Sequence, residues 1–111
     1  MESQNDTTAI EVTVTCASAD EAAVIGRAVV EAGLVACAKS WPVASTFRWN
    51  GAVEAADEHL LVLTTVAGRF DEVCARIGEL HSYELPAIGA VPVRALGPGV
   101  AEWIVESTGR T

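Results

Sequence analysis

One cysteine, one histidine and a group of acidic residues are of types that bind transition metals, although they lie far apart in the sequence. Cys16 supplies a thiol, His81 an imidazole, and Glu54, Asp57 or Glu58 a carboxylate. Together these donors suit a borderline metal such as Cu or Zn. The thiol must lose its proton and the imidazole must stay neutral, so metal affinity should fall in acid. The fold has to bring these residues together.

Hydrophobic spacing predicts the elements on either side of Cys16. Residues 9–16 alternate between apolar and polar side chains, which is typical of a strand with one buried face. Ser18, followed three residues later by Glu21, forms a capping box that begins a helix. Gly33 supplies its C-terminal cap. The chain therefore begins with a strand followed by a helix.

A long hairpin is predicted in the middle of the chain. Residues 34–49 and 52–66 both read as strands, and the Asn50-Gly51 pair between them is a strong hairpin signal. The two arms are long for a domain of this size. A hairpin that extends beyond its own core needs a partner, for which another copy of the chain is well suited.

The second half of the chain predicts a helix, a strand and a short final helix. Residues 68–80 carry apolar side chains at helical spacing, and residues 87–95 form a strand that Pro92 places at a sheet edge. A third helix follows Gly97-Pro98, with Trp103 and Ile104 among its inward-facing residues. It ends near residue 108.

The predicted order matches an α+β fold of the ferredoxin-like, split βαβ type, with an appended C-terminal helix. Its antiparallel sheet places the first and third strands in the middle. The end of the first strand, the start of the third and the start of the fourth then meet at one end of the sheet. This topology brings Cys16, one of the three candidate carboxylates and His81 together.

Composition limits the classes of protein to be considered. The chain has 111 residues, a net charge of −8 and 50% hydrophobic residues. These values fit one folded domain, which we expect over residues 9–111 behind a flexible tail at residues 1–8. The acidity excludes binding to a nucleic-acid backbone or docking on an anionic membrane. The absence of a signal sequence and the odd number of cysteines predict a cytoplasmic protein.

Plainer roles for the same residues stay open. Cys16 could be a small buried apolar residue, and His81 could simply complement a helix dipole. A Cys16–His81 nucleophile pair is conceivable, but the sequence contains no catalytic motif around it. We therefore expect neither an enzyme nor an organic cofactor.

Several stretches taken together resemble the CutA family of divalent-cation tolerance proteins, from Ile10 to Ile104. Their order and spacing carry the resemblance. The matching residues are Cys16-Ala17-Ser18-Ala19-Asp20-Glu21-Ala22, Gly33-Leu34-Val35-Ala36-Cys37-Ala38, Ser45-Thr46-Phe47-Arg48-Trp49-Asn50-Gly51, Glu54, Glu58, Leu60 to Thr65, His81-Ser82-Tyr83-Glu84-Leu85-Pro86 and Trp103.

The resemblance implies a homotrimer with a ferredoxin-like fold, similar in assembly to PII signalling proteins and linked by the long hairpins. It also implies divalent-cation binding, notably of copper, with Cys16, Glu58 and His81 as the ligands. The alternative is a PII-like regulatory or scaffold trimer that binds a small ligand or a protein in clefts between subunits.

The sequence departs from the family pattern at four positions. Ser82 replaces a proline, Thr64 a lysine, Ala87 an acidic residue and Phe47 a tyrosine. Without that proline, the turn that holds His81 is less rigid. The paired loss of a lysine and an acid indicates that a salt bridge or polar pocket of the family is missing here.

Overall fold

The computed structural model describes residues 4–109 and contains a four-stranded sheet and three α-helices. None of these helices is long and apolar enough to cross a membrane. In chain order the elements are β1 (Ala9–Cys16), α1 (Ala19–Glu31), β2 (Cys37–Trp49), β3 (Ala52–Val66), a 3₁₀ turn (Ala67–Arg69), α2 (Phe70–Leu80), β4 (Gly89–Pro92) and α3 (Val100–Thr108).

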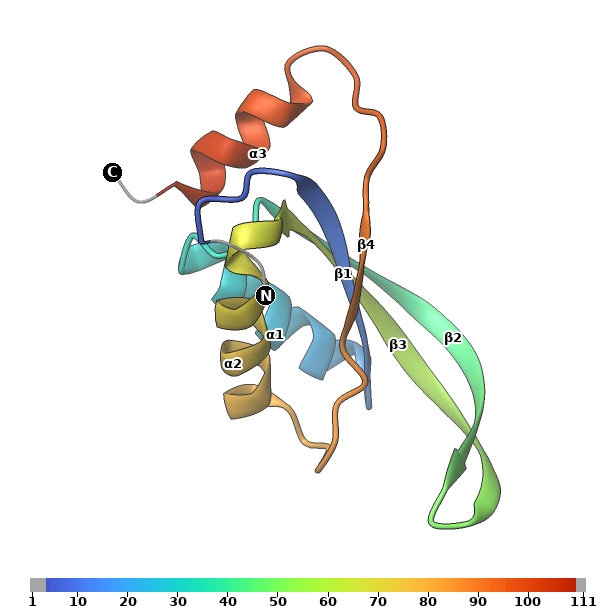
Figure 1. The fold of residues 1–111 in the computed structure, drawn as a ribbon. Helices are drawn as coiled ribbons and strands as arrows, with labels where there is room; N and C mark the ends of the chain where they lie inside the picture. The colour runs from blue at the N-terminus through green and yellow to red at the C-terminus, as the bar shows by residue number, and fades with distance from the viewer. Residues whose placement is uncertain (1–3, 110–111) are drawn as a thin grey trace.

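The sheet has the strand order β2-β3-β1-β4, and all neighbouring strands are antiparallel. This arrangement confirms the predicted split βαβ fold, with β1 and β3 in the middle. Helices α1 and α2 lie on one face of the sheet, and α3 lies at the end of the sheet far from the hairpin tip (Figure 1). On the opposite face, α3 covers only that end of the sheet, where Ile104 packs against Ala9 and Val66.

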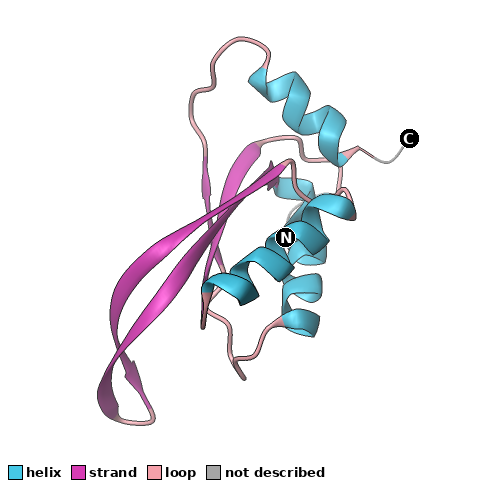
Figure 2. Cartoon of the chain, turned by 180° about the vertical axis from the view of Figure 1, so that it is seen from behind, coloured by secondary structure: helices cyan, strands magenta, loops and turns pink. Residues whose placement is uncertain are grey.

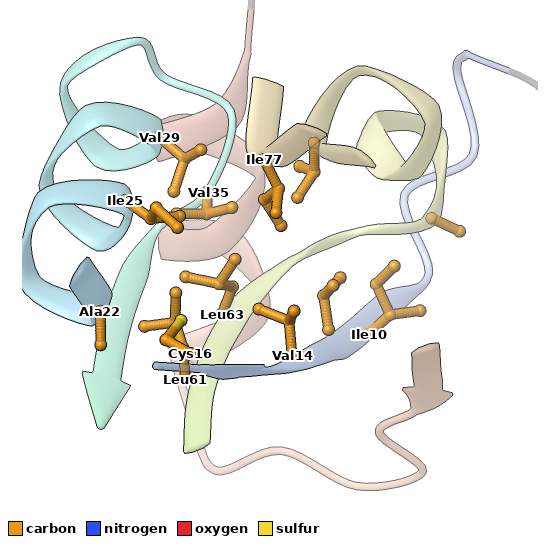
Figure 3. Packing of buried hydrophobic residues seen from close by; sticks show 13 residues of the cluster. Ile10, Val14, Cys16, Ala22, Ile25, Val29, Val35, Leu61, Leu63 and Ile77 are labelled. Carbon is orange, nitrogen blue, oxygen red and sulfur yellow. The ribbon is translucent and has the colours of Figure 1, made fainter. Parts of the chain in front are cut away.

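The core lies between the sheet and the helices α1 and α2. Alternate residues of β1 and β3 point toward the helices, so that Val12, Val14, Leu61 and Leu63 are almost fully buried. Ile25 of α1 and other helix residues pack against them (Figure 3). The other face of the same strands is less covered, because Leu60 and Val62 of β3 remain half-buried.

The hairpin of β2 and β3 extends well beyond the helices (Figure 2). Its turn uses left-handed backbone at Asn50, with φ of 50°, and at Gly51, with φ of 80°. Asparagine and glycine tolerate this region, as the sequence predicts. Pairing continues through Pro42 opposite His59, and the proline is tolerated because β2 is an edge strand.

Three details differ from the expectations drawn from sequence. Strand β4 covers residues 89–92 rather than 87–95, although the Val93 amide still donates to the Ala9 carbonyl oxygen. The second helix begins at Phe70 after a 3₁₀ turn. Trp103 was expected to face inward but is 45% exposed, whereas Ile104 beside it is 1% exposed. Helix α3 rests on the sheet end through one narrow stripe.

The predicted N-terminal tail lies partly outside the described residues, at positions 1–3. Within the described part, the carbonyl oxygens of Asp6 and Thr8 accept hydrogen bonds from the amides of Gly68 and Ala67. The flexibility of residues 1–8 as a whole stays a prediction.

Candidate metal site

Three segments meet at the end of the sheet where β1 stops. Cys16 is the last residue of β1 and pairs with His59, so Glu58 follows directly on the neighbouring strand. Helix α2 ends at Leu80, and His81 caps it with its amide donating to the Ile77 carbonyl oxygen at 2.9 Å. The register therefore brings the backbones of Cys16 and Glu58 to the same end of the sheet, with their side chains on opposite faces.

The structure separates the three carboxylates that sequence left as alternatives. Glu58 is 6% exposed at the site end of the sheet. Asp57 is exposed, because successive residues of a strand point to opposite faces and Glu58 next to it is buried. Glu54 pairs with Phe47 in the projecting arm of the hairpin. Of these three, Glu58 is the carboxylate whose charge acts on the Cys16 thiol.

A different carboxylate comes closest to the thiol and the imidazole. Cys16, Glu21 and His81 each offer a ligand atom, and these atoms lie within 4.8 Å of one another. Glu58 does not belong to this group. The capping box revealed Glu21 as a residue of the helix start, but not that α1 begins beside His81. The capping box was the only signal in the sequence that pointed to Glu21. The approach of Glu21 to His81 depends on how the start of α1 packs against the turn after α2.

The His81 ring is completely buried and both of its nitrogens have backbone partners. Nδ1 accepts a hydrogen bond from the Tyr83 amide at 3.0 Å, and Nε2 lies 2.9 Å from the Thr15 carbonyl oxygen. An amide can only donate and a carbonyl can only accept, so the neutral ring carries its proton on Nε2. The lone pair on Nδ1 points toward the Tyr83 amide, with Glu21 Oε1 3.9 Å away.

Glu21 ties the start of α1 to the His81 turn. One carboxylate oxygen accepts from the Ala17 amide at 2.9 Å, and the other accepts from the Ser82 amide at 2.8 Å. Burial alone would raise the pKa of Glu21. Hydrogen bonds from Ser82 and Ala17, together with the nearby His81, outweigh burial and lower this pKa. Glu21 is therefore an anion at neutral pH.

Glu58 holds Tyr83 instead. The Tyr83 hydroxyl donates to Glu58 Oε2 at 2.6 Å, and the Tyr83 ring lies against the His81 ring with centroids 4.7 Å apart. Burial opposes the charge on Glu58. Hydrogen bonds from Tyr83, Ser45 and Thr15 nevertheless lower its pKa, with a further contribution from His81. The same contact, after burial, raises the pKa of Tyr83 to about 12.

Cys16 is a protonated thiol in this environment. Burial, with the negative charges of Glu21 and Glu58, raises its pKa to about 11. A reactive nucleophilic cysteine requires the opposite shift, toward the thiolate. A bound cation would reverse this balance, because it stabilises the thiolate directly. The thiol, carboxylate and imidazole thus fit a metal ion better than they fit covalent catalysis.

The geometry can now be compared with known proteins. The sequence profile of the CutA1 divalent ion tolerance protein family matches residues 10–107. The chain belongs to this family. It is 34% identical over 94 residues to the divalent-cation tolerance protein CutA of Archaeoglobus fulgidus, covering 85% of this chain and 92% of that one. It is also 34% identical to the CutA protein of Thermus thermophilus, covering 88% and 96%.

Solved structures of the family have the same fold. The periplasmic divalent cation tolerance protein CutA of Archaeoglobus fulgidus aligns with a TM-score of 0.88 and 32% identity, covering 91% of this chain and 99% of that one. CutA1 of Thermus thermophilus aligns with a TM-score of 0.88 and 33% identity, over the same shares. The family membership predicted from sequence is confirmed, and this CutA1 member is a divalent-cation tolerance protein by family. The family name describes cation tolerance and no catalysed reaction.

Proposed function

We propose that this CutA1 family member binds a divalent transition-metal ion between β1, the start of α1 and the His81 turn. The observation that carries the proposal is the approach of ligand atoms from Cys16, Glu21 and His81 to within 4.8 Å of one another. Sulfur, oxygen and imidazole nitrogen form a donor set suited to copper or zinc. Copper is our first choice, because it binds most strongly in the general order of divalent affinities.

The geometry and the resemblance point to different carboxylate ligands, and a matched pair of variants decides between them. Glu21 lies within the group, whereas the resemblance to the family implies Glu58. If Glu21 is the ligand, Glu21→Gln weakens metal binding by roughly tenfold or more, and Glu58→Gln leaves it within about threefold of wild type. The reverse pattern would assign Glu58.

Calorimetric titration of the protein with Cu²⁺ and Zn²⁺, in the absence of oxygen, tests the site itself. We expect His81→Ala to lower the affinity at least tenfold, because the site then loses its only nitrogen ligand. Val24→Ala is the matched control, since Val24 is 61% exposed on α1 and outside the site. Equal affinities of wild type and His81→Ala would remove the proposed site.

We further propose that the protein acts as a homotrimer. The sheet face opposite α1 and α2 exposes Trp41 and leaves Leu60 and Val62 half-buried, and the hairpin arm exposes Phe47 and Trp49. Apolar surface of this extent supports association between copies. Burial must then offset the repulsion between chains that each carry a net charge of −8. Sedimentation equilibrium should give three times the chain mass, and a mass of 11.6 kDa would refute the trimer.

The cytoplasm is the compartment that we propose for this trimer. All three cysteines are free, which suits a reducing environment. Fractionation of cells that express the protein should place it with cytoplasmic markers. Recovery with periplasmic or membrane markers would contradict this assignment.

A second candidate function rests on a groove that is lined by none of Cys16, Glu21 and His81. A hollow of about 550 Å³ lies between α1 and β2, with Gly26, Arg27, Cys37 and Lys39 among its lining residues. Its volume falls in the range of small-molecule sites. A PII-like regulatory trimer could bind a small anion or a protein there. A thermal-shift screen of metals against nucleotides and small anions separates the two functions, since only a ligand that prefers the folded state raises the melting temperature.

A further inference from the structure

The polar network around His81 has a consequence for any metal that binds there. We propose that the site is closed by its own chain, with Tyr83 as the residue that closes it, and that metal binding releases the Tyr83 amide from His81. This inference rests on the proposed function, because it concerns the regulation of the same site.

The argument begins with the proton on the His81 ring. Because Nε2 donates to the Thr15 carbonyl oxygen, Nδ1 holds the lone pair and accepts from the Tyr83 amide. If Nδ1 becomes a metal ligand, its lone pair is used by the metal and the Tyr83 amide loses its acceptor. If Nε2 becomes the ligand instead, the ring proton must move to Nδ1, which then cannot accept either. Both modes of ligation break the same hydrogen bond.

The geometry favours Nδ1 as the ligand atom. Histidine ligands usually donate the other ring N–H to a carboxylate or a backbone carbonyl, which fixes the tautomer. The Nε2–Thr15 contact of 2.9 Å is already such a bond, and Nδ1 is the nitrogen that lies 3.9 Å from Glu21 Oε1. The ring is therefore held in the orientation that a metal requires, and the Tyr83 amide occupies the ligand position.

The other two candidate ligands respond differently. Each carboxylate oxygen of Glu21 has a second lone pair, so Glu21 can bind a metal while keeping its bonds to Ala17 and Ser82. Cys16 must lose a proton, but no hydrogen bond from its thiol has to be broken within the described network. His81 alone must exchange a protein partner for the metal.

Tyr83 is anchored against this exchange at its other end. Its hydroxyl donates to the buried carboxylate of Glu58 at 2.6 Å, and its ring contacts the His81 ring. Hydrogen bonds to a charged acceptor are stronger than neutral ones. The Glu58 anchor therefore keeps the Tyr83 amide in place and lowers metal affinity. Tyr83 acts as a positioning residue.

Amide NMR on the wild-type protein tests the release directly. Zinc is the probe, because it is diamagnetic. We expect saturation with Zn²⁺ to shift the Tyr83 amide resonance and to speed its hydrogen exchange at least tenfold. The Ser82 amide, which donates to Glu21, serves as the internal control and should keep its protection. A Tyr83 amide that remains protected in the zinc-saturated protein would overturn the inference while leaving the metal site intact.

A variant measures the contribution of the anchor. Tyr83→Phe keeps the ring and the amide but removes the hydroxyl, so we expect zinc to bind roughly three- to tenfold more tightly. Circular dichroism checks that the variant is folded. Affinity that is unchanged or weaker would count against a closing role for Tyr83. If neither wild type nor Tyr83→Phe binds Zn²⁺ or Cu²⁺, the proposed function and the inference both fail, whereas binding by the variant alone would support the closure.

Discussion

The site end of the sheet, where β1 stops at Cys16, and the projecting arm of the β2–β3 hairpin differ in how far one chain satisfies its own side chains. At the site end, every polar group discussed above has a partner: His81 binds two backbone groups, and Glu21 and Glu58 accept several hydrogen bonds. Among the described residues, no buried side-chain nitrogen or oxygen lacks a hydrogen bond. Toward the hairpin tip and on the sheet face opposite α1 and α2, here called the apolar face, large apolar side chains such as Trp41, Phe47 and Trp49 stay exposed.

This difference means that binding at the two regions has different requirements. The site end is folded and internally paired within one chain, so a ligand there must compete with existing hydrogen bonds. The apolar face is incomplete in one chain, so a partner there gains free energy by burial without displacing protein contacts. We therefore expect substitutions on the apolar face to change assembly, and substitutions at the site end to change pH dependence, local stability and binding.

The largest effect should follow a charge placed on the apolar face. Trp41 pairs with Leu60, so both side chains lie on the sheet face opposite α1 and α2. Trp41→Glu removes a large apolar contact and would bury a charge between copies, which is strongly unfavourable. Sedimentation equilibrium should show the mass falling from a trimer to about 11.6 kDa.

Val24→Glu is the matched control for this change. Val24 is more exposed than Trp41, at 61% against 46%, but it lies on α1 in the helical layer. We expect this variant to keep the mass of the trimer. If both variants dissociate, net charge rather than the apolar face controls assembly.

Alkaline pH should produce the next largest effect, at the site end. The folded pKa of Cys16, about 11, is above its ordinary value of 9.0. The unfolded chain therefore releases this proton first, and stability that is complete below pH 9 is lost as the pH rises to 11. Two pKa units at 1.36 kcal/mol each correspond to about 3 kcal/mol.

Urea unfolding at fixed protein concentration, from pH 8 to pH 11, measures this loss. Cys16→Ala should be less stable than wild type throughout, because it leaves a small cavity, but its stability should decline less with pH. The raised pKa of Tyr83 adds a decline of the same sign above pH 10 in both proteins. Parallel pH profiles for the two proteins would mean that Cys16 is not the group responsible.

The features that could be predicted from sequence are those that depend on local patterns or on strand order. Strands β1 and β3 and the Asn50-Gly51 turn could be predicted, because period-two alternation and left-handed turn residues are local properties. The approach of Cys16 and His81 could be predicted as well, since strand order determines which strand ends are neighbours.

Other features depend on packing that the sequence does not display. Glu21 was expected only to cap α1, and its approach to His81 depends on the turn after α2, whose Ser82 amide donates to Glu21. The Tyr83–Glu58 bond depends on how the turn after His81 folds back. Trp103 was wrongly placed in the core because helical spacing selects a face but not the width of the buried stripe.

Acid should produce a smaller loss of stability at the site end. The folded pKa of Glu58 is lowered from its ordinary value of 4.5, so its contribution is present above pH 4.5 and is lost as the pH falls through the folded pKa. Glu58→Gln keeps an acceptor for Tyr83 but does not titrate, so its unfolding free energy should vary less between pH 5 and pH 3. Equal slopes for Glu58→Gln and wild type would show that Glu21 and other carboxylates account for the acid sensitivity.

The smallest effect concerns the start of α1, where local structure and the site meet. The Ser18 hydroxyl accepts a hydrogen bond from the Glu21 amide at 3.1 Å, and Ser18 is exposed, so Ser18→Ala changes the cap with little change in burial. We expect the unfolding free energy to fall by about 1 kcal/mol, with Ser18→Thr close to wild type because it retains the hydroxyl. Because the same cap positions Glu21, zinc affinity should fall in Ser18→Ala and not in Ser18→Thr. Unchanged zinc affinity in Ser18→Ala, together with the expected loss of stability, would separate the helix cap from the metal site and return Glu21 to a purely structural role.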